Sequence, residues 1–208
     1  MAVNIHQGCS LEAMKSMKDN QYDLAVVDPP YGIKQAKGIS YGNWARDIHT
    51  EKDWDNSIPP QEYFDQLFRV SAHQIIWGGN YFIQYLRNTR CFLVWDKHNG
   101  SNPMSDCELA WTSFTSSVRK FTYSHIQDYN AGINRIHPTQ KPVALYHWIY
   151  EKYASPGMKI LDTHLGSGSS AIAAWDCGLD FDGWELDVEY HAGAVTRYQE
   201  HIRQLKLF

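Results

Sequence analysis

The chain has 208 residues, of which 43% are hydrophobic and 20% charged, and 19 basic against 23 acidic side chains give a formal net charge of −4. This size and composition fit one folded domain spanning residues 1–208 and exclude a disordered chain. We expect neither a membrane span nor a signal peptide, and the acidic balance argues against strong non-specific binding to nucleic acid.

Short apolar runs alternate with stretches of helical periodicity, which is the pattern of an α/β sheet with crossover helices. We predict seven strands, at Val3–His6, Asp23–Val27, Gln74–Trp77, Cys91–Trp95, Cys107–Thr112, Met158–Asp162 and Asp180–Glu185. We predict five helices, at Leu11–Met17, Pro60–Ala72, Pro142–Tyr153, Ser169–Cys177 and Val188–Leu205. The sequence therefore predicts one doubly wound sheet with helices on both faces.

Two segments fall outside this alternation. Residues 32–59 are rich in glycine, asparagine and charge, and this length is typical of an active-site loop. Residues 113–136 are polar and mixed, and form a short insertion. The four cysteines are far apart and form no Cys-x-x-Cys pair, so we expect reduced thiols and no metal site.

The first chemical motif follows the second predicted strand and consists of Asp28, Pro29, Pro30 and Tyr31. Functional groups in open α/β sheets gather at the carboxyl ends of strands, where this motif is expected. Two prolines fix the backbone, and Pro29 keeps its carbonyl but has no N–H. A carboxylate, a carbonyl and the ring of Tyr31 suit the exocyclic amine of a nucleobase, and Asp28 would stabilise the positive charge of its alkylation. A simple turn with a solvated Asp28 is the alternative.

The second motif is a glycine loop between the strand ending at Asp162 and a helix starting near Ser169. Gly166 and Gly168 would let a ligand approach the backbone, which is typical of nucleotide and cofactor sites. The loop lacks the third glycine of a dinucleotide site and the lysine of a phosphate-binding loop. Glu185, 19 positions beyond Gly166, is well placed for ribose hydroxyls, although a tight turn with a surface glutamate remains the alternative.

Together these motifs resemble the DNA amino-methyltransferases that use S-adenosylmethionine to modify adenine N6 or cytosine N4. Asp-Pro-Pro-Tyr comes first and Leu-Asp-x-x-x-Gly-Ser-Gly-Ser later, which is similar to the permuted "beta" order of that family. His137–Pro142 resembles the family's segment beside the methionine end of the cofactor. The resemblance implies a Rossmann-like methyltransferase fold with a seven-stranded, mostly parallel sheet containing one antiparallel strand.

The resemblance also assigns roles to individual residues. It implies that Asp28, Pro29, Pro30 and Tyr31 hold and activate the target base. It implies cofactor contacts for Cys9, Ser10, Thr139, Lys141, Asp162, Gly166, Ser167, Gly168, Ser169 and Glu185. The chain departs from the family pattern where Cys9 replaces an aspartate, and where Thr163-His164 replaces Pro-Phe. The segment that corresponds to target recognition is also short.

The resemblance favours N6 of a flipped adenine in DNA as the target, because Asp-Pro-Pro-Tyr leans toward adenine. Cytosine N4, adenine N6 in RNA, and a non-catalytic relative that binds nucleic acid remain alternatives. Cytosine C5 chemistry is not expected, because the chain has no Pro-Cys pair. A base inside a duplex must leave the stack to be modified, and we expect the loop to close over it. Candidate nucleic-acid contacts are Tyr41, Trp44, Lys97, Arg119, Lys120 and Arg135.

The net charge of −4 conceals a local excess of positive charge. Residues 87–141 contain seven basic and four acidic side chains, a local balance of +3. This predicts modest, salt-sensitive affinity for DNA rather than none. The expected location is the cytoplasm, with a cellular or phage origin. The family resemblance leaves room for a homodimer and for a restriction endonuclease partner in the same system.

Overall fold

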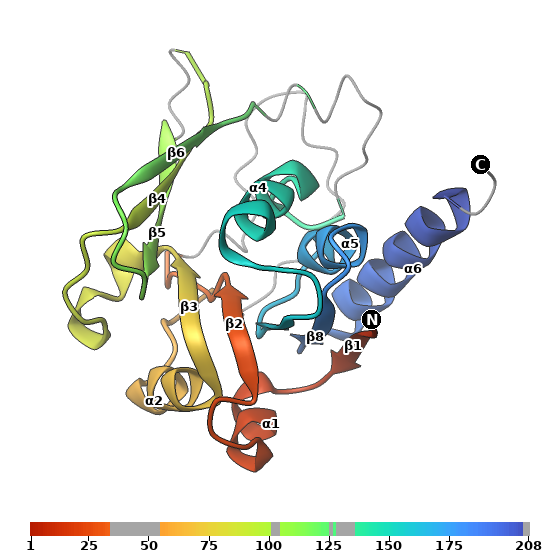
Figure 1. Cartoon of the computed structure of the whole chain (residues 1–208), viewed down its shortest axis with the longest axis horizontal. Coiled ribbons are helices and arrows are strands. Elements are labelled where there is room, and N and C mark those ends of the chain that lie inside the picture. Colours follow the sequence, from red (N-terminus) through yellow and green to blue (C-terminus); the bar gives the residue numbers. More distant parts are fainter. Residues whose placement is uncertain (34–54, 101–104, 125–126, 128–135, 206–208) are drawn as a thin grey trace.

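The computed structural model describes residues 1–33, 55–100, 105–124, 127 and 136–205. Its strands are β1 (Val3–Gln7), β2 (Tyr22–Val27), β3 (Ser71–Trp77), β4 (Phe92–Asp96), β5 (Cys107–Thr112), β6 (Arg119–Thr122), β7 (Lys159–Asp162) and β8 (Asp180–Glu185). Its α-helices are α1 (Ser10–Ser16), α2 (Gln61–Val70), α4 (Val143–Tyr153), α5 (Ser169–Asp176) and α6 (Val188–Leu205). Two 3₁₀ turns, η3 (Gly79–Tyr81) and η4 (Ile83–Tyr85), follow β3 (Figure 1).

The eight strands form one sheet in the order β1-β8-β7-β2-β3-β5-β4-β6. The five strands from β1 to β3 in this order are parallel, whereas β5 is antiparallel to both β3 and β4. The edge strand β6 is parallel to β4. Because β5 alone is reversed, its first residues lie at the edge of the sheet where its neighbours end.

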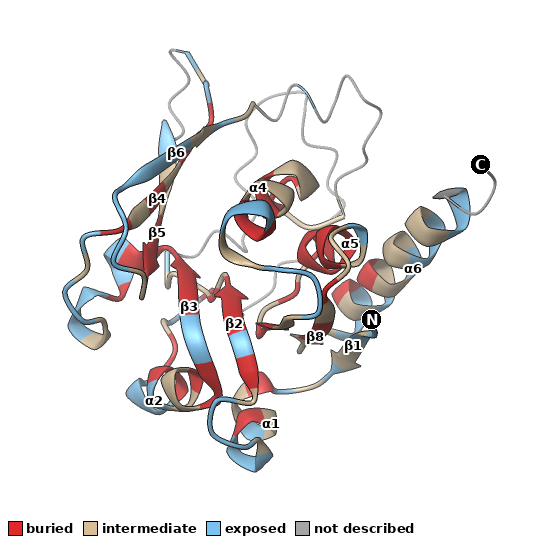
Figure 2. Cartoon of the chain, in the orientation of Figure 1, coloured by how far each residue is buried: buried red, intermediate tan, exposed pale blue. Residues whose placement is uncertain are grey.

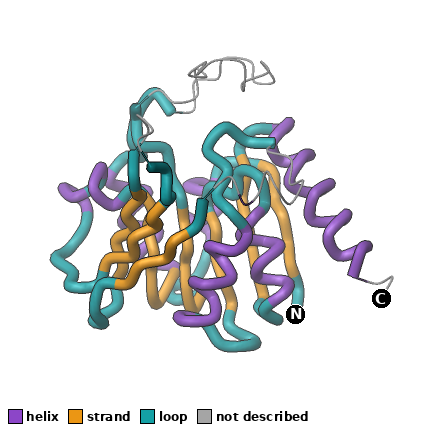
Figure 3. The backbone as a smooth tube through the Cα atoms, turned by 90° about the horizontal axis from the view of Figure 1, so that it is seen from above, coloured by secondary structure: helices purple, strands orange, loops and turns teal. Residues whose placement is uncertain are grey.

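Helices cover both faces of the sheet, and each face has its own core. Alternate residues of β2 point to opposite sides, so that Leu24 and Val26 pack with α4 and α5, while Ala25 and Val27 pack with α1 and α2. Buried residues concentrate along the central strands and the inner faces of α4 and α5 (Figure 2). Seen from above, the strands lie between two layers of helices, with α6 beyond the sheet on the side of the N-terminal strand (Figure 3).

The predicted α/β class, the single antiparallel strand and the helices on both faces are confirmed. All seven predicted strands and five predicted helices are present, with ends that differ by at most three residues. The predicted strand count of seven was wrong, because β6 extends the sheet from within residues 113–136. Three of the four β6 residues are exposed, so the strand lacks the apolar run that reveals the others. In the part of the chain that the structure describes, no helix could cross a membrane.

Candidate active site

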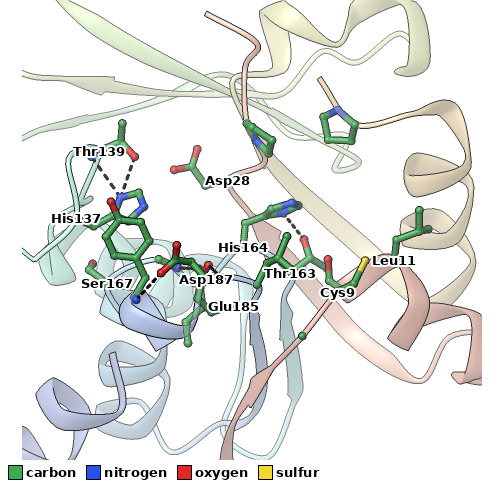
Figure 4. Close-up of a pocket in the computed structure, with 18 of the residues that line it drawn as sticks. Cys9, Leu11, Asp28, His137, Thr139, Thr163, His164, Ser167, Glu185 and Asp187 are labelled. Carbon is green, nitrogen blue, oxygen red and sulfur yellow. Dashed lines mark hydrogen bonds between the residues drawn. The ribbon is translucent and has the colours of Figure 1, made fainter. Parts of the chain in front are cut away.

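A cavity of about 890 Å³ opens at the edge of the sheet where the parallel strands end. Loops that follow β1, β2, β7 and β8 line it, together with the segments before α2 and α4. Figure 4 shows part of this lining, with Asp28, Glu185 and Cys9 contributed by three different segments of the chain. Both motifs found in the sequence therefore meet at one site, although 138 positions separate Asp28 from Gly166.

Asp28 lies at the cavity wall directly after β2, and both of its carboxylate oxygens are occupied. The Tyr31 hydroxyl donates to Oδ1 at 2.6 Å, and Lys141 Nζ donates to Oδ2 at 2.5 Å. Burial raises the pKa of Asp28, and the Lys141 ammonium opposes that rise. Pro30 lines the cavity, whereas Pro29 is buried behind it.

Tyr31 is held by its neighbours rather than directed freely into the cavity. Its ring stacks on Tyr81 of η3, with 4.8 Å between centroids and 15° between planes. The backbone of Gly78 lies against the same ring. Tyr81 thus covers one face of the ring expected to stack on a base.

The glycine loop approaches the cavity through Gly166, Ser167 and Ser169. Gly168 begins α5 with φ of +77° and packs on Ala194 of α6 instead of lining the cavity. Arg197 of α6 supports the loop, because its Nη1 donates to the Ser167 carbonyl at 2.9 Å and to Ser169 Oγ at 2.8 Å.

Glu185 ends β8 and is joined to the glycine loop by hydrogen bonds. The Gly166 N–H donates to Glu185 Oε2 at 2.8 Å, and the Asp187 N–H donates to Oε1 at 2.9 Å. Burial raises the pKa of Glu185, partly offset by these backbone donors. Glu185 lines the cavity, and Cys9 and Ser10 lie in the same lining.

Asp162 lies beneath the glycine loop and is not part of the cavity lining. It accepts hydrogen bonds from the Ser170 hydroxyl at 2.5 Å and from the His164 N–H at 3.0 Å. Burial raises its pKa to about 7 and lowers the pKa of His164 to about 4. Thr163 accepts or donates a 2.6 Å hydrogen bond with Tyr63. The structure therefore gives Asp162 a role in holding the loop.

Thr139 and Lys141, both expected near the cofactor, line the cavity at different points. The Thr139 N–H donates to His137 Nδ1 at 3.3 Å, and the His137 ring lies against Gly166. Lys141 instead bonds Asp28 and pairs with Glu108 at 3.0 Å. Its ammonium thus belongs to the Asp28 side of the site.

The candidate nucleic-acid contacts are spread over different environments. Lys97 is buried and pairs with Glu108 at 2.7 Å, so contact with a phosphate would require that pair to break. Arg119 is exposed on β6, and Lys120 pairs there with Asp96 at 3.0 Å. Because Lys97 and Lys141 are both paired inside the protein, less of the local positive charge is free for DNA. Tyr41, Trp44 and Arg135 lie outside the described residues.

The predicted segments 32–59 and 113–136 are described only in part. At the base of the first, the Gly32 N–H donates to Asp55 Oδ1 at 2.8 Å. Ser57 through Pro60 then line the cavity, so this base borders the site.

Sequence reasoning missed Glu108 and Arg197. Glu108 is the second residue of β5, whereas the predicted catalytic and cofactor residues follow strands or lie in loops. An acidic residue inside an otherwise apolar strand was the available signal. The sequence Gly78-Gly79-Asn80-Tyr81 after a strand indicates either a border of the site or a simple turn, and the structure places Tyr81 against Tyr31. Nothing in the pattern of α6 distinguishes Arg197 from its exposed neighbours.

Comparison with known proteins gives the family. The profile of the DNA methylase family for N6 and N4 methylation matches residues 76–196, which is more than half of the chain. The chain belongs to this family. It is a DNA methyltransferase of the N6-adenine/N4-cytosine group, whose members use S-adenosylmethionine. The profile match begins after Asp28–Tyr31, so it does not itself test that motif.

Individual relatives agree with this assignment. The Type II methyltransferase M2.MboI of Moraxella bovis is 26% identical, over 98% of this chain and 90% of its own length. The M1.HpyAVI–SAM complex has a TM-score of 0.62 at 18% identity, with 93% of this chain and 98% of that chain covered. The cytosine-N4-specific PvuII DNA methyltransferase has a TM-score of 0.63 at 14% identity, with 98% and 92% covered. At these identities, the likeness to the two structures supports the fold alone and not the target base.

The residues around the cavity fit S-adenosylmethionine. Small-molecule sites commonly enclose about 300–1,000 Å³, and this cavity lies within that range. Leu11, Leu186 and Val188 offer apolar walls for a flat ring, and Glu185 offers a carboxylate for hydroxyl groups. Hydroxyls of Thr139, Ser167 and Ser169 lie in the same lining, where they hydrogen bond to His137, to each other and to Arg197.

Proposed function

We propose that this protein transfers a methyl group from S-adenosylmethionine to N6 of a flipped adenine in DNA. The observation that carries the proposal is the placement of Asp28, on its Pro-Pro tip, in the same cavity as Glu185 and the glycine loop. A group that accepts hydrogen bonds from an amine therefore borders a cavity suited to the methyl donor.

Asp28 and the Pro29 carbonyl would accept the two N–H groups of the target amine. The lone pair of that nitrogen is delocalised into the base, so acceptors that draw its hydrogens out of plane favour the reactive geometry. The Asp28 carboxylate also stabilises the positive charge that nitrogen acquires, an electrostatic effect that is often the largest in catalysis. S-adenosylmethionine supplies the electrophilic methyl group.

At the other end of the cavity, Glu185 would hold the ribose hydroxyls of the cofactor, near Cys9 and Ser10. Gly166 and the hydroxyls of Ser167, Ser169 and Thr139 would bind its methionine part. Asp162 and Gly168 contribute by shaping the loop. Tyr31 would stack on the base, which would have to reach a ring that packs on Tyr81 and Gly78 and lies outside the cavity lining. Arg119 and Lys120 would contact phosphates, with Arg135 as a further candidate, and Tyr41 and Trp44 would stack on the flipped base.

The choice of adenine N6 rests on the aspartate of Asp-Pro-Pro-Tyr. Cytosine N4 is the second candidate, because a cytosine-N4-specific enzyme shares this fold. Both amines present the same two N–H groups to Asp28, so the site chemistry serves either. We further propose a single domain acting in the cytoplasm, with a homodimer and a restriction endonuclease as candidate partners.

The test is to incubate the purified protein with S-adenosylmethionine and unmethylated DNA or RNA, and to identify modified nucleosides by mass spectrometry. We expect N6-methyladenine in DNA, and its loss by at least a thousandfold in Asp28→Ala. Asp65→Ala, which removes an exposed carboxylate on α2, is the matched control. N4-methylcytosine, or product only in RNA, would replace the adenine-DNA assignment. Full activity of Asp28→Ala would refute the site.

A further inference from the structure

Four charged side chains form a chain of alternating sign that ends at Asp28. Lys97 Nζ lies 2.7 Å from Glu108 Oε1, Glu108 Oε2 lies 3.0 Å from Lys141 Nζ, and Lys141 Nζ lies 2.5 Å from Asp28 Oδ2. The Lys141 side chain is only 4% exposed and the Lys97 side chain 10%. Two carboxylates and two ammonium groups thus balance one another inside the protein.

The topology of the sheet explains why these groups meet. Asp28 follows β2, and Lys97 follows β4, both at the carboxyl edge of the parallel strands. Glu108 reaches the same edge because β5 is reversed, and it is paired in register with Trp95 of β4. Lys141 arrives from the segment before α4. The ammonium groups of Lys141 and Lys97 also lie 5.4 Å from the ring centroids of Trp77 and Trp95, respectively.

The Asp28 side chain is 17% exposed, and burial raises its pKa above the ordinary value even beside Lys141, so loss of that cation would raise the pKa further. The other titratable groups around Asp28 do not supply a cation: Tyr31, Tyr63, Tyr146, Asp162 and Glu108 are neutral or acidic. Burial leaves His164 uncharged at neutral pH because its pKa is about 4. Among the described residues facing Asp28, Lys141 is the one cation. Burial opposes the charge of Glu108 as well, but Lys141 and Lys97 hold its pKa at about 2.

We propose that Lys141 is the positioning residue that keeps Asp28 ionised and oriented toward the target amine, and that Glu108 and Lys97 hold Lys141 in place. This inference rests on the proposed function of Asp28 as the acceptor for that amine. Each carboxylate oxygen has a second lone pair, so Asp28 can keep its bonds to Lys141 and Tyr31 while it accepts the amine. Glu108 fixes the ammonium from the opposite side, which prevents Lys141 from following the substrate.

The direct test is to titrate the Asp28 carboxylate by carbon-13 NMR in the cofactor-free protein, with its signal assigned through Asp28→Asn. Lys141→Met should raise the pKa of Asp28 by about one unit or more, because an opposite charge has been removed. Glu108→Gln should lower the pKa of Asp28, because it removes a like charge while the neutral amide oxygen can still accept from Lys141 and keep the ammonium in place. Lys141→Arg retains the cation and should largely restore the wild-type pKa.

Lys15→Met is the matched control, because Lys15 also pairs with two carboxylates, at 2.9 and 3.1 Å, but lies on the surface. It should leave the pKa of Asp28 unchanged. Opposite shifts in Lys141→Met and Glu108→Gln are not expected from general loosening of the structure. An Asp28 pKa that is the same in wild type and folded Lys141→Met would overturn the proposal.

The second readout is the pH dependence of methyl transfer. Lys141→Met should lose at least tenfold in kcat at pH 7 and recover part of that loss toward pH 9, because its Asp28 ionises at higher pH. An equal loss at every pH would count against the proposal. If wild type methylates no nucleic acid, the proposed function fails, while the NMR titration still decides whether Lys141 controls Asp28.

Discussion

Gly78 lies so close to the ring of Tyr31 that a Cβ atom at Gly78 would come within 2.2 Å of Tyr31 Cε1. Gly78 also has φ of +69°, which is strained for any residue with a side chain. Its N–H donates to the Leu109 carbonyl of β5 at 2.9 Å, so the backbone cannot retreat without breaking that bond. The position of Tyr31, and with it one hydrogen bond to Asp28, therefore depends on a glycine after β3.

Gly78→Ala should displace Tyr31 and reduce both activity and stability. We expect a loss of about 2–4 kcal/mol in the free energy of unfolding, from the positive φ and the steric clash together. Gly100→Ala is the control, because Gly100 has φ of +65° but open space around its Cα. Chemical denaturation gives the free energy of unfolding of both variants. The cost of a positive φ is common to the two, whereas the clash with Tyr31 is expected in Gly78→Ala alone. Equal losses in the two variants would contradict a role for the Tyr31 contact.

Arg197→Met should weaken binding of S-adenosylmethionine without changing the fold. The substitution removes donors to Ser167 and Ser169, and two hydrogen bonds from a charged group correspond to a roughly tenfold or larger rise in Kd. Isothermal titration calorimetry measures the effect. Arg203→Met, at an exposed site on the same helix, should bind as wild type does. Unchanged affinity in Arg197→Met would show that the loop holds its shape without this arginine.

Glu185→Gln should also reduce cofactor affinity, by roughly tenfold to a hundredfold. The carboxylate accepts hydrogen bonds from the Gly166 and Asp187 N–H groups on its two oxygens, and an amide can replace only one of these acceptors. Equilibrium dialysis with labelled cofactor would detect the change. Glu200→Gln serves as a control, because it alters an exposed glutamate on α6. Wild-type affinity in Glu185→Gln would remove Glu185 from the proposed cofactor site.

Asp162→Asn should become more stable relative to wild type as pH rises. Burial raises the pKa of Asp162 from 3.8 to about 7, so the folded protein retains a proton that the unfolded chain has released. The stability associated with that proton is complete below about pH 4 and is lost as pH rises through 7. Urea unfolding at pH 5 and pH 8 should show a relative change of roughly 2 kcal/mol in favour of the variant. The same difference at both pH values would show that Asp162 does not titrate in this range.

Helices and strands could be predicted where burial requires a regular pattern of apolar residues. β2 and β7 are short apolar runs because both of their faces are covered, and α6 shows clear helical periodicity. β6 could not be predicted this way, because Arg119 and Lys120 are exposed and its position depends on pairing with β4. The Gly78-Gly79 pair after β3 indicates a turn, but its packing against Tyr31 and Trp111 could not be predicted from local sequence.

The site was predictable where a residue follows a parallel strand, as Asp28 and Glu185 do. Glu108 escaped prediction because a single sequence does not reveal which strand is reversed. Lys97 was predicted to contact phosphate because it is a cation in a basic region, but pairing across β4 and β5 places it against Glu108. Charge counts along a sequence do not distinguish a solvated lysine from a buried one.

The pairing of β1 with β8 has a consequence for how the chain folds during synthesis. Among the described strands β1 comes first along the chain, yet it pairs with the last of them, β8, and the bond from the Ala2 N–H to Asp180 spans 178 positions. β1 must therefore wait until β8 has been synthesised before it can dock, and contacts of such long range slow folding. Because Gly8–Ser10 follow β1 and line the cavity, the pocket should be among the last parts of the molecule to form on the ribosome.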